Sequence, residues 1–90
     1  MKNETNQWLE NGENAYKKGL YEKAFMWFQK AAQQDDHRAL KRLGDMYYYG
    51  NGVEEDYGKA LDYYQAAEAK GNQEAGRLYE QVLHVINLSI

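Results

Sequence analysis

A chain of 90 residues with a formal net charge of −3 fits one small domain and lacks the basic surplus usual in nucleic-acid-binding proteins. It has no cysteine, which excludes disulfides and thiolate metal sites, and its two histidines lie outside any metal or catalytic-triad motif. No apolar run approaches the roughly 20 residues of a membrane span, and no export-type apolar segment follows Met1, so we expect a cytoplasmic protein.

The N-terminal part of the chain predicts two helices joined at a glycine. Over residues 4–18, Trp8, Gly12 and Ala15 recur at the three- and four-residue spacing of an amphipathic helix. Gly19 favours the end of this helix, because glycine tolerates the left-handed conformation common just after a helix. A second helix is expected over 21–34, with small and aromatic residues facing inward: Ala24, Phe25, Phe28, Ala31 and Ala32.

Three further helices are expected to begin at capping residues. Asp36, Asp56 and Asn72 each carry a side-chain oxygen that can accept from exposed N–H groups two or three residues later. The third helix is expected to stop at Gly50-Asn51-Gly52, the fourth at Gly71 and the fifth near residue 86. No proline interrupts them, so the pattern predicts an all-α fold of five helices.

The chain also repeats itself. The segment at 23–31 (Lys-Ala-Phe-Met-Trp-Phe-Gln-Lys-Ala) returns at 59–67 as Lys-Ala-Leu-Asp-Tyr-Tyr-Gln-Ala-Ala, a shift of 36 residues. A period in the mid-thirties with helical spacing inside each unit is typical of a helix-pair solenoid. Such arrays mainly offer a surface to another molecule, which indicates a binding function and leaves the partner open.

Two sets of residues carry a family resemblance. Trp8-x2-Asn11-Gly12 with Ala24-x3-Phe28, and Leu43-Gly44-x2-Tyr47 with Ala60-x3-Tyr64, resemble the tetratricopeptide signature. The longer loop over 48–56 (Tyr-Tyr-Gly-Asn-Gly-Val-Glu-Glu-Asp), followed by Lys59-Ala60, looks like that of a Sel1-like repeat. The resemblance implies a single domain with a tetratricopeptide-like repeat over 5–36, a Sel1-like repeat over 37–71 and a capping helix and tail over 72–90. The implied architecture is a right-handed α-α superhelix.

Within such a stack, small residues are expected where paired helices cross. We expect Gly12 to face Ala24 and Ala31, and Gly44 to face the equivalent alanines of the second unit, so that the backbones approach closely.

The family geometry implies that the first helix of each pair lines a concave face, which is the candidate site for a protein or peptide. Aromatic rings beside arginines are the side chains that dominate protein interfaces. The inner face is expected to comprise Asn6, Leu9, Glu13, Tyr16 and Lys17, then Arg38, Lys41, Asp45, Tyr48 and Tyr49, then Glu74, Arg77, Gln81 and His84.

A basic cluster of Arg38, Lys41 and Arg77 is expected in this groove. Arg38 and Arg42 also resemble the basic pair of carboxylate-gripping tetratricopeptide domains. Leu9 and Glu13, however, replace the lysine and asparagine of that clamp, so an ordinary solvated basic face is favoured.

The C-terminal segment is unusually apolar. A solenoid end that exposes such a surface tends to be covered by another chain, which predicts a homodimer or a docked partner. A simple capping helix with a frayed tail is the alternative. The candidate self-association residues are Leu83, Val85, Ile86, Leu88 and Ile90.

The function favoured by these features is that of a non-enzymatic adaptor or scaffold. No phosphate-binding glycine loop is present, and the acidic run at 54–56 lacks the calcium-loop pattern, so we expect no cofactor, no metal and no catalytic residue. Two alternatives remain: an immunity-type inhibitor that occludes a partner enzyme or toxin, and a self-associating structural element.

Overall fold

The computed structural model describes residues 2–89, with side chains from Glu4 onward. These residues form five α-helices and no strand, which confirms the all-α prediction. The helices are α1 (Lys2–Lys17), α2 (Tyr21–Ala32), α3 (His37–Tyr49), α4 (Tyr57–Ala69) and α5 (Gln73–Leu88).

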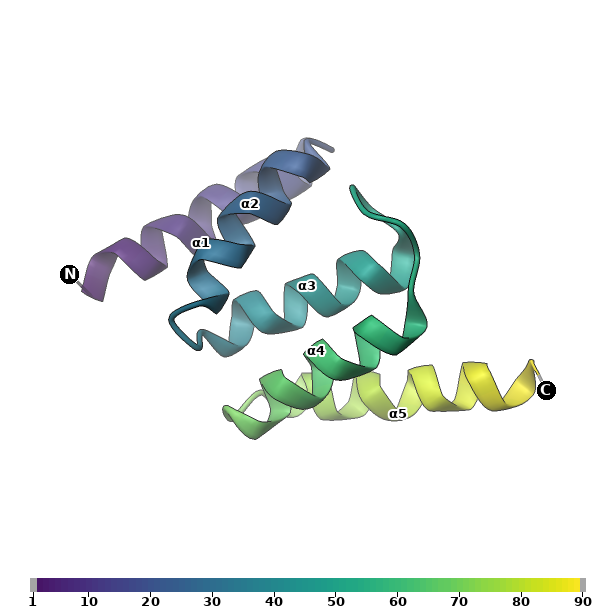
Figure 1. Cartoon of the computed structure of the whole chain (residues 1–90). Helices are drawn as coiled ribbons and strands as arrows, with labels where there is room; N and C mark the ends of the chain where they lie inside the picture. Colours follow the sequence, from purple (N-terminus) through teal and green to yellow (C-terminus); the bar gives the residue numbers. More distant parts are fainter. Residues whose placement is uncertain (1, 90) are drawn as a thin grey trace.

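The helices stack in chain order, and each one packs against the next (Figure 1). In Figure 1, α1 and α2 lie at one end, α3 in the middle, and α4 and α5 at the other end. The result is an elongated slab of 45 × 27 × 16 Å. This arrangement is a short helical solenoid, as the repeat predicted.

Side-chain caps begin the last three helices, as predicted. The Asp36 carboxylate accepts from the backbone N–H groups of Arg38 and Ala39 at 2.9 and 3.2 Å. Asp56 and Asn72 accept from backbone N–H groups three residues later, at 3.0 and 2.9 Å. Each cap satisfies donors that the first helical turn leaves without a partner.

The predicted end of the second helix was two residues too late. The helix ends at Ala32, and residues 33–35 form a turn in which Asp35 adopts a φ of 60°. A helix cannot continue through this left-handed conformation, which Asp tolerates better than most residues. In contrast, α5 continues to Leu88, past the predicted end.

The packing core has two parts that share α3. Ala39, Leu43 and Met46 belong to a cluster with α1 and α2, whereas Leu40 belongs to a cluster with α4 and α5. Since α3 is covered on both sides, it is the central helix of the stack and positions the side chains between the two repeats.

Each repeat brings a glycine against an aromatic ring. A Cβ atom at Gly12 would lie 2.6 Å from the ring of Phe28, and one at Gly44 would lie 2.7 Å from the ring of Tyr64. Both rings are fully buried. The expectation that these glycines face alanines was therefore wrong about the nearest neighbour, because each glycine makes room for a ring.

The loop between α3 and α4 folds back onto the first repeat. The side-chain amide of Asn51 donates to the Tyr16 hydroxyl at 2.9 Å. Gly52 has a φ of 77°, and a Cβ atom there would lie 2.8 Å from Cβ of Tyr21. Val53 packs against the cluster shared by α1, α2 and α3. The longer loop thus fastens the two repeats together.

No helix among the described residues is both long enough and apolar enough to cross a lipid bilayer.

Candidate functional site

A small pocket of about 210 Å³ opens where α1, α3 and the start of α5 come together. Helices from both repeats therefore build one site. The pocket is lined by Leu9, Glu13, Arg38, Lys41, Arg42, Asn72 and Glu74.

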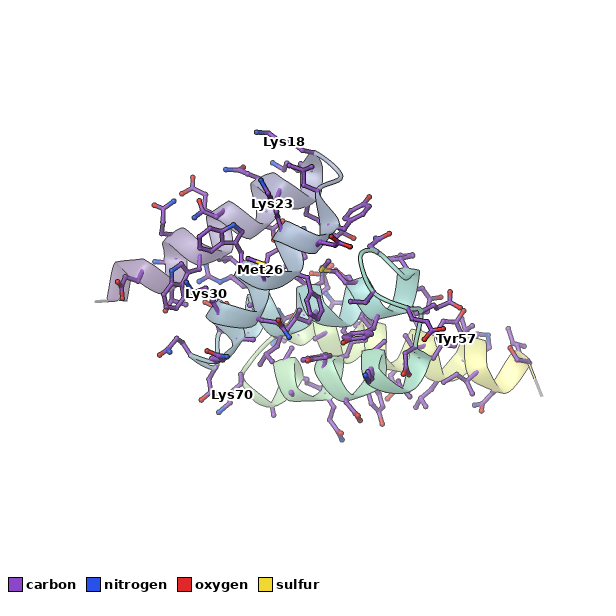
Figure 2. All side chains as sticks on the ribbon, turned by 45° about the horizontal axis from the view of Figure 1, so that its top comes forward. Lys18, Lys23, Met26, Lys30, Tyr57 and Lys70 are labelled. Atoms are coloured by element: carbon purple, nitrogen blue, oxygen red, sulfur yellow. The ribbon has the colours of Figure 1, made fainter. Side chains whose placement is uncertain are left out.

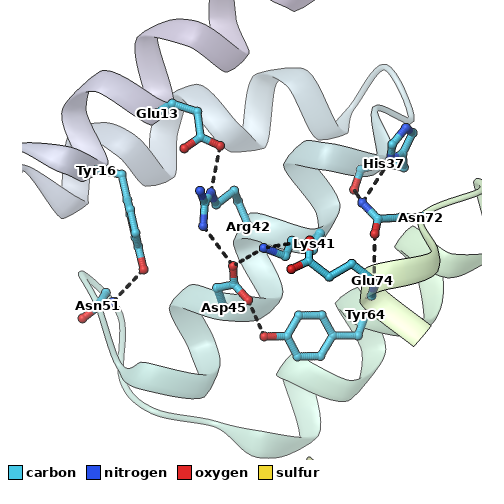
Figure 3. Close-up of polar contacts among 11 residues, drawn as sticks. Glu13, Tyr16, His37, Lys41, Arg42, Asp45, Asn51, Tyr64, Asn72 and Glu74 are labelled. Atoms are coloured by element: carbon cyan, nitrogen blue, oxygen red, sulfur yellow. Dashed lines mark hydrogen bonds and ion pairs between the residues drawn. The ribbon is translucent and has the colours of Figure 1, made fainter. Parts of the chain in front are cut away.

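Asp45 lies beside this pocket and is the centre of a buried polar network (Figure 3). One carboxylate oxygen accepts from the Tyr64 hydroxyl at 2.5 Å. The other lies 3.1 Å from Lys41 Nζ and 3.2 Å from Arg42 Nη1. Asp45 is only 6% exposed, so the expectation that its side chain lines the open groove was wrong. A buried carboxylate needs such partners, and the hydroxyl and the two cations stabilise Asp45 in the interior.

Arg42 connects the first repeat to the second. Its Nε donates to the Glu13 carboxylate of α1 at 2.8 Å, and its guanidinium lies 5.2 Å from the centre of the Tyr16 ring. The hydrogen bond to Glu13 raises the pKa of the guanidinium above its usual value. Because Arg42 is engaged with Glu13 and Asp45, it is not a free basic group for gripping a carboxylate ligand.

The two tyrosines of this network serve as neutral hydrogen-bonding groups. Burial, followed by the bond to Asp45, raises the pKa of Tyr64 far above its ordinary value, so its hydroxyl keeps the proton that it donates. Burial is also the main reason why the pKa of Tyr16 is raised. The Tyr16 ring packs against Tyr21 and Phe28, which makes it largely structural.

The expected basic cluster does not form a single surface. Lys41 is paired with Asp45 and, at 3.6 Å, with Glu74 of α5. Arg38 is paired with Asp36 and also donates to the side-chain oxygen of Asn6 at 2.9 Å. Arg77 instead lines a separate pocket with Glu68, Gly76 and Glu80. The pocket between α1, α3 and α5 therefore carries alternating charges rather than a positive field.

The aromatic part of the expected groove is smaller than the sequence indicated. Tyr48 is half-buried and stacked on Tyr57 with ring centres 5.1 Å apart. Tyr49 lies nearly perpendicular to Tyr48, with ring centres 4.9 Å apart, and is 64% exposed. Tyr49 is thus the aromatic ring of α3 that is most available to a ligand. Two polar residues expected in the groove, Lys17 and Gln81, are also exposed.

The apolar C-terminal residues are only partly available. Leu83 and Val85 are half-buried, and Ile86 packs in the cluster shared by α3, α4 and α5. Leu88 is 73% exposed, and Ile90 lies outside the described residues. Self-association through this segment stays a prediction.

Two of the residues that line the pocket, Arg42 and Asn72, were not among those expected on the inner face. Asn72 was assigned only as a cap, yet its side-chain nitrogen also lies 3.0 Å from His37 Nδ1. Glu74 was placed on the inner face without its pairing to Lys41. The three-residue spacing of Arg42 and Asp45 on one helix was a signal for an ion pair.

Among the described residues, no group of three or more His, Cys, Asp or Glu side chains is arranged to hold a metal ion.

Comparison with known proteins identifies the repeat. The sequence model of the Sel1 repeat matches residues 7–36 and again residues 37–72. Two similar proteins of Arabidopsis thaliana are the ERAD-associated E3 ubiquitin-protein ligase components HRD3B and HRD3A. Each is 38% identical over 50 residues, which is 56% of this chain and 8% or 7% of the relative.

A Sel1-like repeat-containing protein of Schizosaccharomyces pombe is 46% identical over 44 residues, covering 49% of this chain and 7% of the relative. The chain thus spans less than a tenth of the length of the curated relatives it matches. Because both helix pairs match the same repeat, this chain belongs to the Sel1 repeat family.

Proposed function

We propose that this chain is a non-enzymatic adaptor that holds a segment of another protein on its concave face. Sel1 repeats generally take part in protein–protein interactions. The relatives HRD3A and HRD3B are named as components of an E3 ubiquitin-protein ligase, a description that supports an interaction role.

The observation that carries the proposal is the pocket between α1, α3 and α5. Arg42 ties α3 to Glu13 of α1, and Lys41 ties α3 to Glu74 of α5. These ion pairs hold the walls together before any ligand arrives. A preformed site loses less conformational entropy on binding, which favours affinity.

The charges of the pocket favour a particular kind of segment. The exposed rim carries Arg38, which is paired with Asp36, and Glu74, which is paired with Lys41. Leu9 belongs to the buried core and adds an apolar part to the lining. A peptide with both hydrogen-bond donors and acceptors, and one small apolar side chain, complements this arrangement. A purely acidic C-terminus fits it poorly, because the cations of the pocket already have carboxylate partners.

Site-specific photo-crosslinking tests the proposal. A photoreactive amino acid is placed at position 38 or 49 on the concave face, and at exposed position 65 on α4 as the matched control. We expect a partner to be cross-linked from positions 38 and 49 and not from 65. Equal cross-linking from all three positions would contradict the concave face as the site.

The purified partner then allows a quantitative check by calorimetry. Arg38→Ala and Tyr49→Ala are expected to weaken binding about tenfold each, which is about 1.4 kcal/mol. Both side chains lie at the surface, so circular dichroism should show an unchanged fold. Unchanged affinity in both variants would count against the concave face.

A further inference from the structure

A second surface lies on the outer side of α2, away from the pocket described above. Met26 is 61% exposed there, with Lys23 one turn before it and Lys30 one turn after it. Figure 2 shows these three side chains in a row along α2, with Lys18 beyond one end. An exposed large apolar side chain between lysines is unlike the rest of this helix, whose inner side is buried.

The lysines of this surface are free of carboxylate partners. In the part of the chain that the structure describes, Arg38, Lys41, Arg42 and Lys70 all form ion pairs. Among the same described residues Lys18, Lys23 and Lys30 form none, as is also true of Lys17, Lys59 and Arg77. Glu22, one turn before Met26, is the sole carboxylate of α2. A chain of net charge −3 therefore carries a local positive surface on its first repeat.

Lys30 is held in place by aromatic rings instead of by an acidic group. Its ammonium lies 5.2 Å from the ring centre of Trp8 and 5.4 Å from that of Trp27. A cation–π contact fixes the position of the charge and leaves it able to attract an anion. Trp27 is half-buried and adds an apolar ring at the Lys30 end of this surface, through its contact with the Lys30 ammonium.

We propose that this outer face, formed by Lys18, Lys23, Met26, Trp27 and Lys30 and here called the α2 face, docks an acidic segment of a partner protein. The segment carries an apolar or aromatic side chain that covers Met26, and its carboxylates pair with the flanking lysines. Charge complementarity selects this occupant, because unpaired lysines beside an apolar centre attract carboxylates on both sides of an apolar anchor. The thioether of methionine also contacts aromatic rings favourably.

The α2 face and the concave pocket share no residue, so one chain has room for two partners. An adaptor that engages different segments on two sides brings them together, and the α2 face adds this capacity to the proposed function without depending on it.

A displayed library of random peptides, selected on the whole chain, tests this inference. We expect the selected peptides to be rich in Asp and Glu around an aromatic or large apolar residue. Met26→Asp and Lys30→Glu should each weaken binding of a selected synthetic peptide by about tenfold or more. Binding should also weaken as salt is raised, because exposed charges are screened.

Lys59→Glu is the matched control. Lys59 also lies over an aromatic ring, that of Tyr47 at 5.2 Å, but on α4. The Lys59→Glu substitution should leave peptide binding unchanged. Selected peptides without an acidic bias, or peptides that bind Met26→Asp as well as the wild-type chain, would overturn the proposal.

Two other occupants are distinguished in the same series. Co-sedimentation with phosphatidylserine vesicles that is lost in Lys30→Glu, without any selected acidic peptide, would assign the face to a membrane surface and overturn the inference. A concentration-dependent dimer that Met26→Asp abolishes would assign the α2 face to a second copy of this chain and would also overturn the inference.

Discussion

The Tyr64 hydroxyl donates to the Asp45 carboxylate across 2.5 Å in the interior of the second repeat. The first repeat uses the same two positions differently. Phe28 stands where Tyr64 does in the repeat and has no hydroxyl, and Glu13 stands where Asp45 does. Glu13 therefore turns toward Arg42 of the next repeat. The position of Asp45 and Glu13 in the repeat thus has two uses. Asp45 accepts a hydrogen bond from its own repeat, and Glu13 accepts one from the next repeat.

Removing the Tyr64 hydroxyl should destabilise the fold. Tyr64→Phe keeps the ring against Gly44 but leaves the buried Asp45 carboxylate with one donor fewer. The expected loss is about 1–3 kcal/mol in the free energy of unfolding, the usual cost of an unsatisfied buried acceptor. Urea denaturation followed by circular dichroism measures it.

Tyr63→Phe is the matched control for this experiment. Tyr63 is half-buried and stacked on Tyr47, and its hydroxyl has no hydrogen-bond partner among the described residues. Its removal should change stability by less than about 0.5 kcal/mol. Equal losses in the two variants would show that the bond to Asp45 is not the cause.

The raised pKa of Tyr64 predicts a loss of stability in alkali. Burial, with the bond to Asp45, keeps the phenol protonated in the folded chain well above its ordinary pKa of 10.0. The unfolded chain releases this proton near that ordinary value. The protonated Tyr64 phenol therefore makes its full contribution to the free energy of unfolding below pH 10. This contribution is lost progressively as the pH rises above 10, by about 1.4 kcal/mol per pH unit for one such group.

Urea unfolding at several pH values between 8 and 11 checks this dependence. The free energy of unfolding should fall above pH 10, and the slope should be shallower in Tyr64→Phe. A variant with the same slope as the wild-type chain would assign the alkaline loss to other tyrosines, such as Tyr16 or Tyr63, whose pKa values burial also raises.

The fold followed from local signals, whereas the site depended on contacts between repeats. Asp36, Asp56 and Asn72 cap helices through atoms a few residues away, so the sequence around each one was sufficient to predict its role. The burial of Asp45 depends on Tyr64 and on the lysine and arginine that surround it. Helical spacing places Asp45 on a face of α3 but does not say what covers that face.

The contact between Lys41 and Glu74 was hidden for the same reason, because Glu74 lies in the next unit of the stack and nothing in the spacing of either helix reveals that the two meet. The shorter pair of Lys41 with Asp45, in contrast, is signalled by their four-residue spacing on α3. The end of α2 was hidden for a different reason, since Asp35 adopts a positive φ without the glycine that usually marks such a turn.

The ion pair between Glu13 and Arg42 should couple the two repeats energetically. Glu13→Ala and Arg42→Ala are each expected to lower stability, and the double variant should lose less than the sum of the two. The expected coupling is about 0.5–1.5 kcal/mol, because both side chains are partly shielded from water. A double-mutant cycle in urea measures it, and it should shrink at high salt. Additive losses would mean that the pair contributes nothing to the joint between repeats.

The close approach of the α3–α4 loop to the first repeat predicts that Gly52 is hard to replace. In Gly52→Ala, the new Cβ atom would lie 2.8 Å from Cβ of Tyr21, on a backbone whose φ of 77° already disfavours alanine. The strained φ contributes about 1–2 kcal/mol, and the crowding is expected to add about 1–3 kcal/mol.

Gly19 separates the two causes. It has the same φ of 77°, but nothing lies within 4 Å of the Cβ atom that alanine would add. Gly19→Ala should therefore lower the free energy of unfolding only by the amount that the strained φ costs. If urea denaturation gives equal losses for the two variants, the contact between Gly52 and Tyr21 does not hold the loop to the first repeat. A larger loss at Gly52 means that the longer loop of the second unit fastens it to the first unit through the backbone as well as through Asn51.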